Sequence, residues 1–259
     1  MSKILAITNQ KGGVGKTTTT VNLAASLGAA KQRVLLIDLD PQGNATMGSG
    51  INKADLEISI YDVLMGEKSV AEARIQSSVC KYDVLPANRE LAGAEIELVD
   101  VEGREMRLKE ELQPILHEYD YILVDCPPAL NLLTLNGLCA AKSVMIPMQC
   151  EYYALEGLSD LVNTIRKVRE NLNPDLEIEG LLRTMFDPRN ALAQQVSDQL
   201  QQHFGDKVYR TVIPRNVRLA EAPSFGIPAL YHDSQSKGTL AYLALAGEML
   251  NNSTVQVAA

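Results

Sequence analysis

The amino-acid sequence predicts an α/β fold, with a mostly parallel, twisted sheet that carries helices on both faces. Short apolar runs alternate with longer helical patterns along the chain, as expected for right-handed crossovers between parallel strands. The apolar runs are continuous rather than alternating, which is typical of strands covered on both faces. Both observations favour one layer of sheet between two layers of helices.

Six runs are predicted as strands because they are short and apolar: Lys3–Thr8, Arg33–Asp38, Tyr121–Asp125, Ser143–Pro147, Glu179–Leu182 and Val208–Ile213. The helical patterns that separate or follow them are Lys16–Ala30, Arg104–Glu118, Leu155–Leu172, Ala191–Phe204 and Gly238–Leu250. No repeat or Pro/Gly-rich linker divides the chain. One domain over residues 1–250 is therefore predicted, followed by a flexible tail over residues 251–259.

The composition fits an ordinary globular domain. Hydrophobic residues make up 46% of the 259 residues and charged residues 22%, which is enough apolar material for a core. The net charge of −8 excludes a global positive field for nucleic acid. Residues 180–259 carry seven Lys/Arg against six Asp/Glu, so a local basic patch stays open there.

The cysteines and the apolar runs exclude several other classes of protein. Cys80, Cys126, Cys139 and Cys150 show no Cys-x-x-Cys spacing, so buried reduced thiols are predicted rather than a zinc site or a disulfide. No run approaches the roughly 20 apolar residues of a membrane-spanning helix, and no signal peptide opens the chain. We therefore expect a soluble, cytoplasmic protein.

A phosphate-binding loop is predicted between the first strand and the first long helix. It reads Lys11-Gly12-Gly13-Val14-Gly15-Lys16-Thr17, with Thr18 following. Glycines let backbone N–H groups turn toward phosphate oxygens, and the next helix adds the partial positive charge of its N-terminus. In such loops the lysine at the position of Lys16 reaches the β- and γ-phosphates, and the hydroxyl at the position of Thr17 suits Mg²⁺. The sequence thus predicts a single P-loop NTPase domain that binds ATP and Mg²⁺.

One departure from the general phosphate-loop motif is informative. Gln10 stands where the motif has glycine, and Lys11 adds a second lysine five residues before Lys16. Two ammonium groups beside one loop are unfavourable unless a polyanion lies close by. Here the chain resembles the deviant Walker A ATPases of the ParA/MinD superfamily. The resemblance implies that Lys11 reaches across a dimer interface to the partner's nucleotide, so that ATP binding is coupled to homodimer formation.

Three aspartates follow apolar strands, at the edge where α/β folds bind their ligands: Asp38, Asp40 and Asp125. The resemblance implies that Asp40 orients the attacking water in hydrolysis and that Asp38 supports Mg²⁺. Asp125 is interpreted as the Walker B-like acid, which holds Mg²⁺ through a water. A role as a turn former stays open for Asp38.

Longer segments narrow the resemblance to one family within this superfamily. NQKGGVGKTTTTVNLA, VLLIDLDPQGNAT, LAGAEIELV, YILVDCPPAL, PMQCEYYALEGL and VYRTVIPRNVRLAEAPSFG are similar to the chromosomal ParA/Soj partition ATPases. That family binds DNA non-specifically as ATP dimers and works with a ParB-like centromere-binding protein, so the resemblance implies slow, partner-stimulated hydrolysis on the nucleoid.

The same resemblance implies roles for residues of the C-terminal part. Arg189 and Arg218 lie at positions of DNA-contacting arginines, and Arg215 and Lys237 stay open as extensions of that patch. Pro214 and Asn216 are expected to line the adenine pocket, mainly through backbone. Glu151–Leu158 is expected near the dimer interface, although its tyrosines fit a core equally well.

Two alternatives remain open. One is a regulatory ATP-binding module that controls a protein partner in division or replication initiation with little reliance on turnover. The other is a small-molecule ligase built on the same phosphate-loop architecture. A MinD-like membrane anchor is not expected, because the stretch from Ala241 onward has no Lys or Arg.

Overall fold

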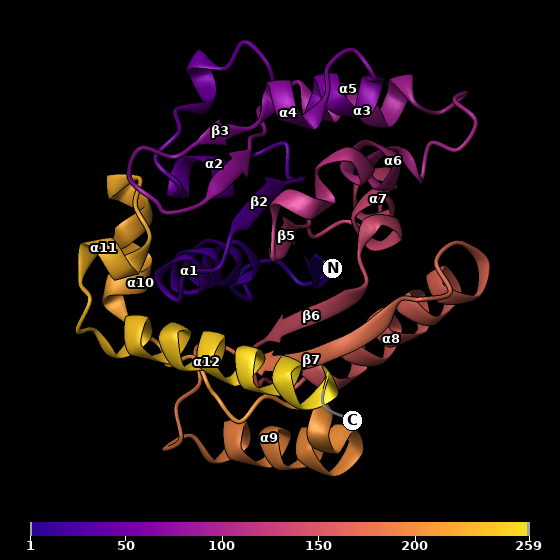
Figure 1. Cartoon of the computed structure of the whole chain (residues 1–259). Helices are drawn as coiled ribbons and strands as arrows, with labels where there is room; N and C mark the ends of the chain where they lie inside the picture. Colours follow the sequence, from indigo (N-terminus) through magenta and orange to yellow (C-terminus); the bar gives the residue numbers. More distant parts are fainter. Residues whose placement is uncertain (1, 258–259) are drawn as a thin grey trace.

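The computed structural model describes residues 2–257 and has the predicted alternation of strands and helices (Figure 1). Within these residues one sheet contains β1 (Lys3–Ile7), β2 (Val34–Asp38), β3 (Ile75–Gln76), β4 (Asp83–Leu85), β5 (Tyr121–Asp125), β6 (Ser143–Met148) and β7 (Glu177–Arg183). The strand order is β3-β4-β2-β5-β1-β6-β7. All pairings are parallel except that of β3 with β4, which is antiparallel. The predicted fold class is thus confirmed.

Helices cover both faces of the sheet. One face packs against α3 (Ile60–Met65), α5 (Leu91–Glu97), α6 (Arg107–Leu112), α7 (Leu132–Ala140), α8 (Ala154–Asn171) and α9 (Ala191–Phe204). The other packs against α1 (Lys16–Ala29), α11 (Ala229–His232) and α12 (Lys237–Val257). Shorter elements complete the chain: α2 (Asn44–Gly48), α4 (Val70–Ala73), α10 (Val217–Glu221), and the 3-10 helices η1 (Lys53–Asp55), η2 (Gln113–Glu118), η3 (Gly205–Lys207) and η4 (Ala222–Phe225).

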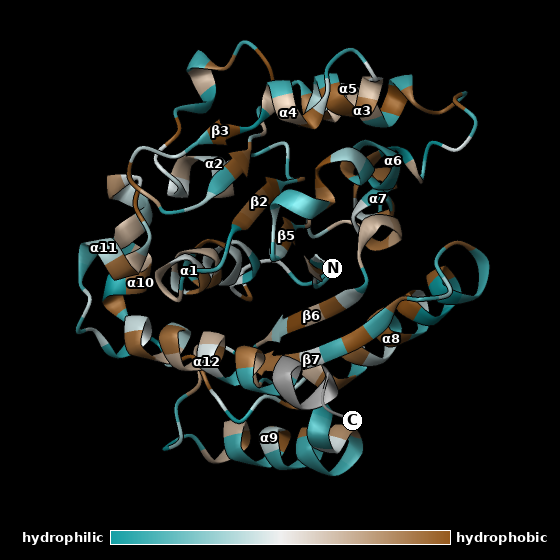
Figure 2. Cartoon of the chain, in the orientation of Figure 1, coloured by the Kyte–Doolittle hydropathy of each residue, from teal (hydrophilic) through white to brown (hydrophobic). Residues whose placement is uncertain are grey.

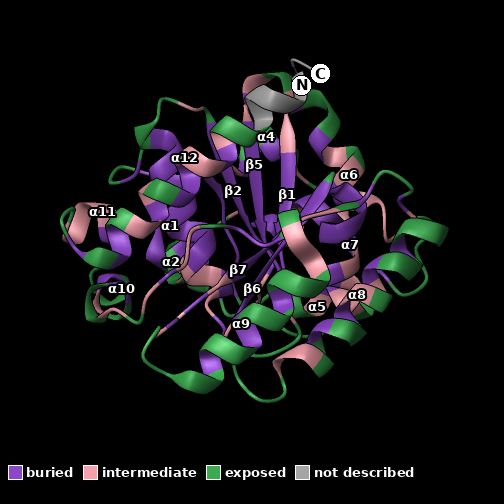
Figure 3. Ribbon diagram, turned by 90° about the horizontal axis from the view of Figure 1, so that it is seen from below, coloured by how far each residue is buried: buried purple, intermediate pink, exposed green. Residues whose placement is uncertain are grey.

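The apolar composition of the strands explains this layering. All five residues of β2 and of β5 are buried, so neither face of these strands meets water. Figure 2 shows the apolar colour concentrated on the strands and on the inward sides of the helices. Figure 3, seen from below, shows the strands buried at the centre and the exposed residues on the outer helices. Among residues 2–257, no helix combines the length and hydropathy that a membrane span requires.

The register of the central strands brings the predicted site together. Asp125, the last residue of β5, pairs with Ile7 of β1 on one side and with Asp38 of β2 on the other. Because parallel strands end at the same edge, the loop after β1 and the carboxylates after β2 and β5 meet at one place.

Several predicted elements differ in the structure. Residues 208–213 do not form a strand, although Val208 is bridged to Leu181 and the following Pro214 to Phe186. Between these bridges the backbone N–H groups of Arg210 and Thr211 donate to the Glu248 carboxylate of α12 instead of to a strand. The helix predicted over Arg104–Glu118 is shorter and gives way to η2, because Pro114 lacks a backbone donor and ends the α-helical hydrogen bonding.

The end of the chain also differs from the prediction. The last helix continues past Leu250 to Val257, since neither Gly nor Pro interrupts it there. Ala258 and Ala259 of the predicted tail lie outside the described residues, and the flexibility of residues 251–259 stays a prediction.

Candidate nucleotide-binding site

The phosphate loop joins β1 to α1 and leaves its backbone open. Gly13 and Gly15 have φ of +73° and +90°, a conformation that side chains with a Cβ rarely adopt. A Cβ placed on Gly12 or Gly13 would meet no atom within 4 Å. The Thr184 hydroxyl donates to the Val14 carbonyl at 2.7 Å and holds the loop from the end of β7. The loop therefore has the open, left-handed backbone that a phosphate chain requires.

Lys16 begins α1, and its side chain points back over the loop. Its Nζ donates to the Lys11 carbonyl at 3.2 Å. Burial lowers the pKa of this ammonium, and the nearby Asp125 carboxyl opposes that shift. Among the side chains that the structure describes, none is hydrogen-bonded to this ammonium, whose contact is the Lys11 carbonyl, so it suits an incoming phosphate.

Asp125 is buried against two threonines of α1. Thr17 Oγ1 donates to Asp125 Oδ2 at 2.7 Å, and Thr20 Oγ1 donates to Asp125 Oδ1 at 2.9 Å. Burial, followed by repulsion from Asp38, raises the pKa of Asp125. The hydroxyl and the carboxylate predicted for the Mg²⁺ site are thus in direct contact. This oxygen donor set fits Mg²⁺, with Thr17 placed to contact the ion and Asp125 to support a bound water.

Asp38 has its oxygens occupied by its own loop. Oδ2 accepts from the backbone and the hydroxyl of Thr46, both at 2.8 Å, and Oδ1 accepts from the Asp40 backbone at 3.1 Å. Burial raises the pKa of this carboxyl. The geometry makes Asp38 the group that shapes the loop after β2, which is the turn-forming role left open by the sequence. It leaves a supporting role toward Mg²⁺ rather than direct coordination.

Asp40 lies at the edge of the site, where the chain leaves β2. It is half-buried, and its Oδ1 accepts from the Gln42 backbone at 2.9 Å. The Gly43 backbone closes the same turn on the Asp40 carbonyl at 2.8 Å. The second carboxylate oxygen is not used in these contacts. A carboxylate held at the rim with one oxygen available is suited to orienting a water molecule.

Lys11 faces outward. Its Nζ forms an ion pair of 2.6 Å with Glu151, and about half of each side chain is exposed. Beside Glu151, Tyr152 and Tyr153 are 73% and 71% exposed, so these tyrosines are not core residues. Glu151 and Thr184 are thus two contacts of the loop to which the sequence analysis assigned no such role. Residue type alone does not reveal them, because both lie far from the loop in sequence.

The segment predicted to line the adenine pocket is held by its backbone. Pro214 is bridged to Phe186, and the Asn216 side chain accepts from the backbone of Arg218 and Leu219 as the N-cap of α10. The side-chain oxygen Oδ1 of Asn216 is therefore used by the helix cap. The adenine contacts expected from this loop, mainly through its backbone, stay a prediction.

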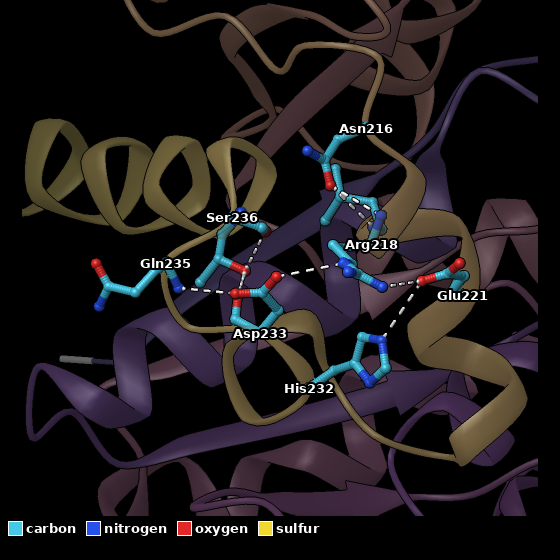
Figure 4. Close-up of polar contacts among 9 residues, drawn as sticks. Asn216, Arg218, Glu221, His232, Asp233, Gln235 and Ser236 are labelled. Carbon is cyan, nitrogen blue, oxygen red and sulfur yellow. Dashed lines mark hydrogen bonds and ion pairs between the residues drawn. The ribbon is translucent and has the colours of Figure 1, made fainter.

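The two arginines predicted to contact DNA lie on different segments. Arg189 is in the loop before α9 and forms a two-pronged ion pair with Asp187, at 2.9 and 2.8 Å. Arg218 is on α10 and lies between Glu221 at 2.8 Å and Asp233 at 3.3 Å (Figure 4). Figure 4 also shows His232 beside Glu221, at 3.7 Å. Both guanidinium groups are exposed, and each is held by carboxylates of its own surroundings.

The four cysteines are all buried and free, as predicted. Within residues 2–252, no group of three or more His, Cys, Asp or Glu side chains could hold a metal ion on its own. Mg²⁺ at the phosphate loop would accordingly be held jointly by the protein and the phosphates.

Comparison with known proteins identifies the family. The model of an AAA domain family matches residues 2–178. The sporulation initiation inhibitor protein Soj of Bacillus subtilis is 57% identical over 97% of this chain and 100% of its own. The chromosome partitioning protein ParA of Myxococcus xanthus is 51% identical, over 98% and 90% of the two chains.

A solved structure shares the fold along its whole length. The cobyrinic acid a,c-diamide synthase of Mycobacterium smegmatis, crystallised with an ATP analogue and magnesium, superposes with a TM-score of 0.86 at 36% identity. The similarity covers 98% of this chain and 96% of that one. With the phosphate loop and its aspartates in place, these matches show that the chain belongs to the AAA domain family and, within it, to the ParA/Soj chromosome-partitioning ATPases.

Proposed function

We propose that this protein is an ATP-dependent dimerising switch that binds DNA non-specifically and hydrolyses ATP slowly to drive chromosome or plasmid partition. The observation that carries the proposal is the contact of Thr17 with the buried Asp125, beside the open loop and Lys16. This arrangement suits Mg²⁺ and the phosphates of ATP, and a solved structure 36% identical to this chain was crystallised with an ATP analogue and magnesium.

Dimerisation would be coupled to ATP through Lys11. Its ammonium is exposed and paired with Glu151 across the solvent-facing side of the loop. An exposed ion pair of this kind is weak, so phosphate in a second subunit is a competitive partner for the ammonium. Two subunits that close face to face would exchange the Glu151 contact for the partner's nucleotide. The exposed Tyr152 and Tyr153 lie on the same surface and would be covered at the same time.

Hydrolysis would then reset the switch. Asp40 binds the Gln42 backbone through Oδ1, and its other carboxylate oxygen is proposed to orient the attacking water. Slow hydrolysis would open the dimer and release DNA that Arg189 and Arg218 hold by its phosphates. A ParB-like partner would accelerate this step, and the DNA-bound dimer would be associated with the nucleoid.

A regulatory module is the second candidate, because a relative 57% identical to this chain is named a sporulation initiation inhibitor. In such a module the ATP-bound state is the output and turnover matters little. Asp40→Ala separates the two functions, since it would block a partition cycle but preserve or strengthen a regulatory output. A ligase reaction, suggested by the name of the Mycobacterium smegmatis protein, predicts ATP turnover that depends on a small-molecule acid.

The experiment that tests the proposal is binding to random-sequence duplex DNA with ATP, with ADP and without nucleotide, over a series of salt concentrations. We expect binding only with ATP, weakening as salt rises, and lost in Lys16→Ala and in Arg189→Ala. A protein that dimerises on ATP but does not bind DNA would refute the partition function and leave the regulatory one.

A further inference from the structure

The Val14 carbonyl of the phosphate loop is held by a residue from a distant part of the chain. The side chain of Thr184, the residue after β7, is buried, and its Oγ1 donates to that carbonyl at 2.7 Å although the two residues are 170 positions apart. The backbone N–H of Thr184 donates to the Met148 carbonyl, at the end of β6, at 2.8 Å. The hydroxyl therefore reaches the loop from backbone that the sheet itself fixes.

The two neighbours of Val14 give the loop a freedom that this contact removes. Gly13 and Gly15 both have positive φ, which glycine adopts without steric cost. Glycine at position 15 also permits rotation on the far side of the Val14–Gly15 peptide group, so that this peptide plane could turn over. The loop therefore needs a contact from outside to keep one orientation of that plane.

The orientation of the Val14 carbonyl sets the direction of the Gly15 N–H. Both groups belong to one peptide unit, and in a planar trans peptide they point to opposite sides. Because Thr184 holds the carbonyl on its own side, the N–H is directed away from Thr184. Among the residues that the structure describes, none accepts a hydrogen bond from this N–H. It is left for a phosphate oxygen, which is how such loops use their backbone donors.

The contact of Lys16 with the same loop is of a different kind. Its Nζ donates to the Lys11 carbonyl at 3.2 Å, and a phosphate would compete for that ammonium. A phosphate bound by the Gly15 N–H lies on the other side of the peptide plane from Thr184. It does not compete for the Thr184 hydroxyl, so the hydrogen bond to Val14 is kept when nucleotide binds.

We propose that Thr184 is a positioning residue for the nucleotide: it fixes the Val14–Gly15 peptide plane so that the Gly15 N–H faces the phosphates before they arrive. The inference rests on the ATP-binding part of the proposed function. Thr184 acts through the backbone and does not itself touch the nucleotide. Without its hydroxyl, part of the binding free energy would be used to order the loop.

The test removes the hydroxyl and keeps the shape of the side chain. Thr184→Val is compared with Thr239→Val, which removes another buried hydroxyl, one that donates to the Asp233 carbonyl at 2.8 Å near the start of α12. Calorimetry measures the affinity for ADP with Mg²⁺. We expect Thr184→Val to bind ADP about tenfold more weakly, because the buried Val14 carbonyl loses its partner and the loop its fixed orientation. Thr184→Ser keeps the hydroxyl and should stay within about twofold of the wild type, as should Thr239→Val.

A second readout follows the peptide plane itself. In ¹⁵N–¹H spectra of the nucleotide-free protein, the Gly15 amide should give one sharp signal in the wild type. In Thr184→Val it should broaden or split, because the plane samples two orientations, and ADP with Mg²⁺ should restore a single signal. Urea unfolding of each variant measures its stability separately.

The outcomes distinguish positioning from a purely structural role. A Thr184→Val protein that is less stable but binds ADP like the wild type, with an unchanged Gly15 signal, would overturn the inference. So would an equal loss of ADP affinity in Thr184→Val and Thr184→Ser, because the hydroxyl would then not be the cause. A wild type that does not bind ADP would refute the proposed function itself, and the inference with it.

Discussion

The nucleotide site and the C-terminal arginines use carboxylates in opposite ways. At the nucleotide site, Asp38 and Asp125 are buried and accept hydrogen bonds from hydroxyl and backbone donors. At the arginine surface, Asp187 and Glu221 are half-buried and bind guanidinium groups. The first arrangement fixes buried carboxylates beside the phosphate loop, whereas the second neutralises cations that a polyanion would engage.

The two settings move carboxyl pKa values in opposite directions. Burial raises the pKa of Asp38 and Asp125. Hydrogen bonds from the arginines lower the pKa of Asp187 and Glu221. The nucleotide site is thus organised by the core, while the arginine surface is organised by exchangeable ion pairs.

Lys16→Ala should produce the largest effect. Removal of the buried ammonium should lower ATP affinity by roughly 100-fold or more, because the phosphates lose a charged donor in a partly desolvated site. Calorimetry with a non-hydrolysable ATP analogue measures it. Lys167→Ala, on the exposed side of α8, is the control and should bind like the wild type. An ATP affinity within about threefold of the wild type would show that Lys16 does not bind the phosphates.

Asp40→Ala should separate binding from turnover. Loss of the water-orienting carboxylate should slow hydrolysis roughly 100-fold while ATP still binds, since Asp40 is not placed to hold the phosphates. Phosphate release under saturating ATP is the measurement, with Asp160→Ala on α8 as the control. Normal turnover in Asp40→Ala would show that another group orients the attacking water.

The stability of the ligand-free protein should depend on pH through Asp125. Burial, followed by repulsion from Asp38, raises the pKa of this carboxyl to about 8. In the unfolded chain it titrates near its ordinary value of about 3.9. The folded state therefore holds the proton more tightly, and its contribution to stability is fully present below about pH 4 and is lost as pH rises through about 8.

Urea unfolding at several pH values, in EDTA, checks this dependence. The free energy of unfolding should fall with rising pH between these limits in the wild type. It should fall less steeply in Asp125→Asn, which cannot ionise. Equal slopes in the two proteins would show that Asp125 stays ionised in the folded state, held so by Thr17, Thr20 and Lys16.

Asp187 should show the opposite shift with little effect on stability. Hydrogen bonds from Arg189 lower the pKa of this carboxyl to about 2. The ion pair is therefore complete above the ordinary aspartate pKa and is lost only as pH falls through about 2. Carboxyl ¹³C titration by NMR should find a low midpoint in the wild type and a value near about 3.9 in Arg189→Ala. An unchanged midpoint would mean that the pair does not persist in solution.

The sequence predicted the centre of the fold well because that part is dictated by long apolar runs. The strands around Leu5, Leu36 and Leu123 are continuous and fully buried, and a glycine loop followed by a helix admits few alternatives. Their parallel register then brings Asp38 and Asp125 together without further information.

The edge of the sheet and the segments beside it could not be predicted as well. β3 has two residues and β4 has three, too short for a periodic signal. The helices after Ser59 and Ser69 did carry a different sequence signal, the capping box. Each helix starts with such a box, which Asp62 or Glu72 closes. The run over Val208–Ile213 has the composition of a strand, but the backbone N–H groups of Arg210 and Thr211 donate to the Glu248 carboxylate, which lies far away in the sequence.

The ion pairs between distant residues of the site could not be predicted from the sequence. Lys11 with Glu151 and Arg218 with Asp233 are far apart along the chain, so residue type does not reveal them. The roles of Lys11, Arg189 and Arg218 stay predictions, with their partners now identified.

Light scattering measures the mass of Asp40→Ala with ATP, with and without a short duplex DNA, and thereby tests whether ATP couples dimerisation to DNA binding. ATP should convert the 28.3 kDa chain into a particle of twice that mass that binds DNA. The double variant Lys11→Ala/Asp40→Ala should stay at 28.3 kDa and leave the DNA free. A dimer that forms equally well without Lys11, or DNA binding by the monomer, would contradict the coupling of ATP, dimerisation and DNA.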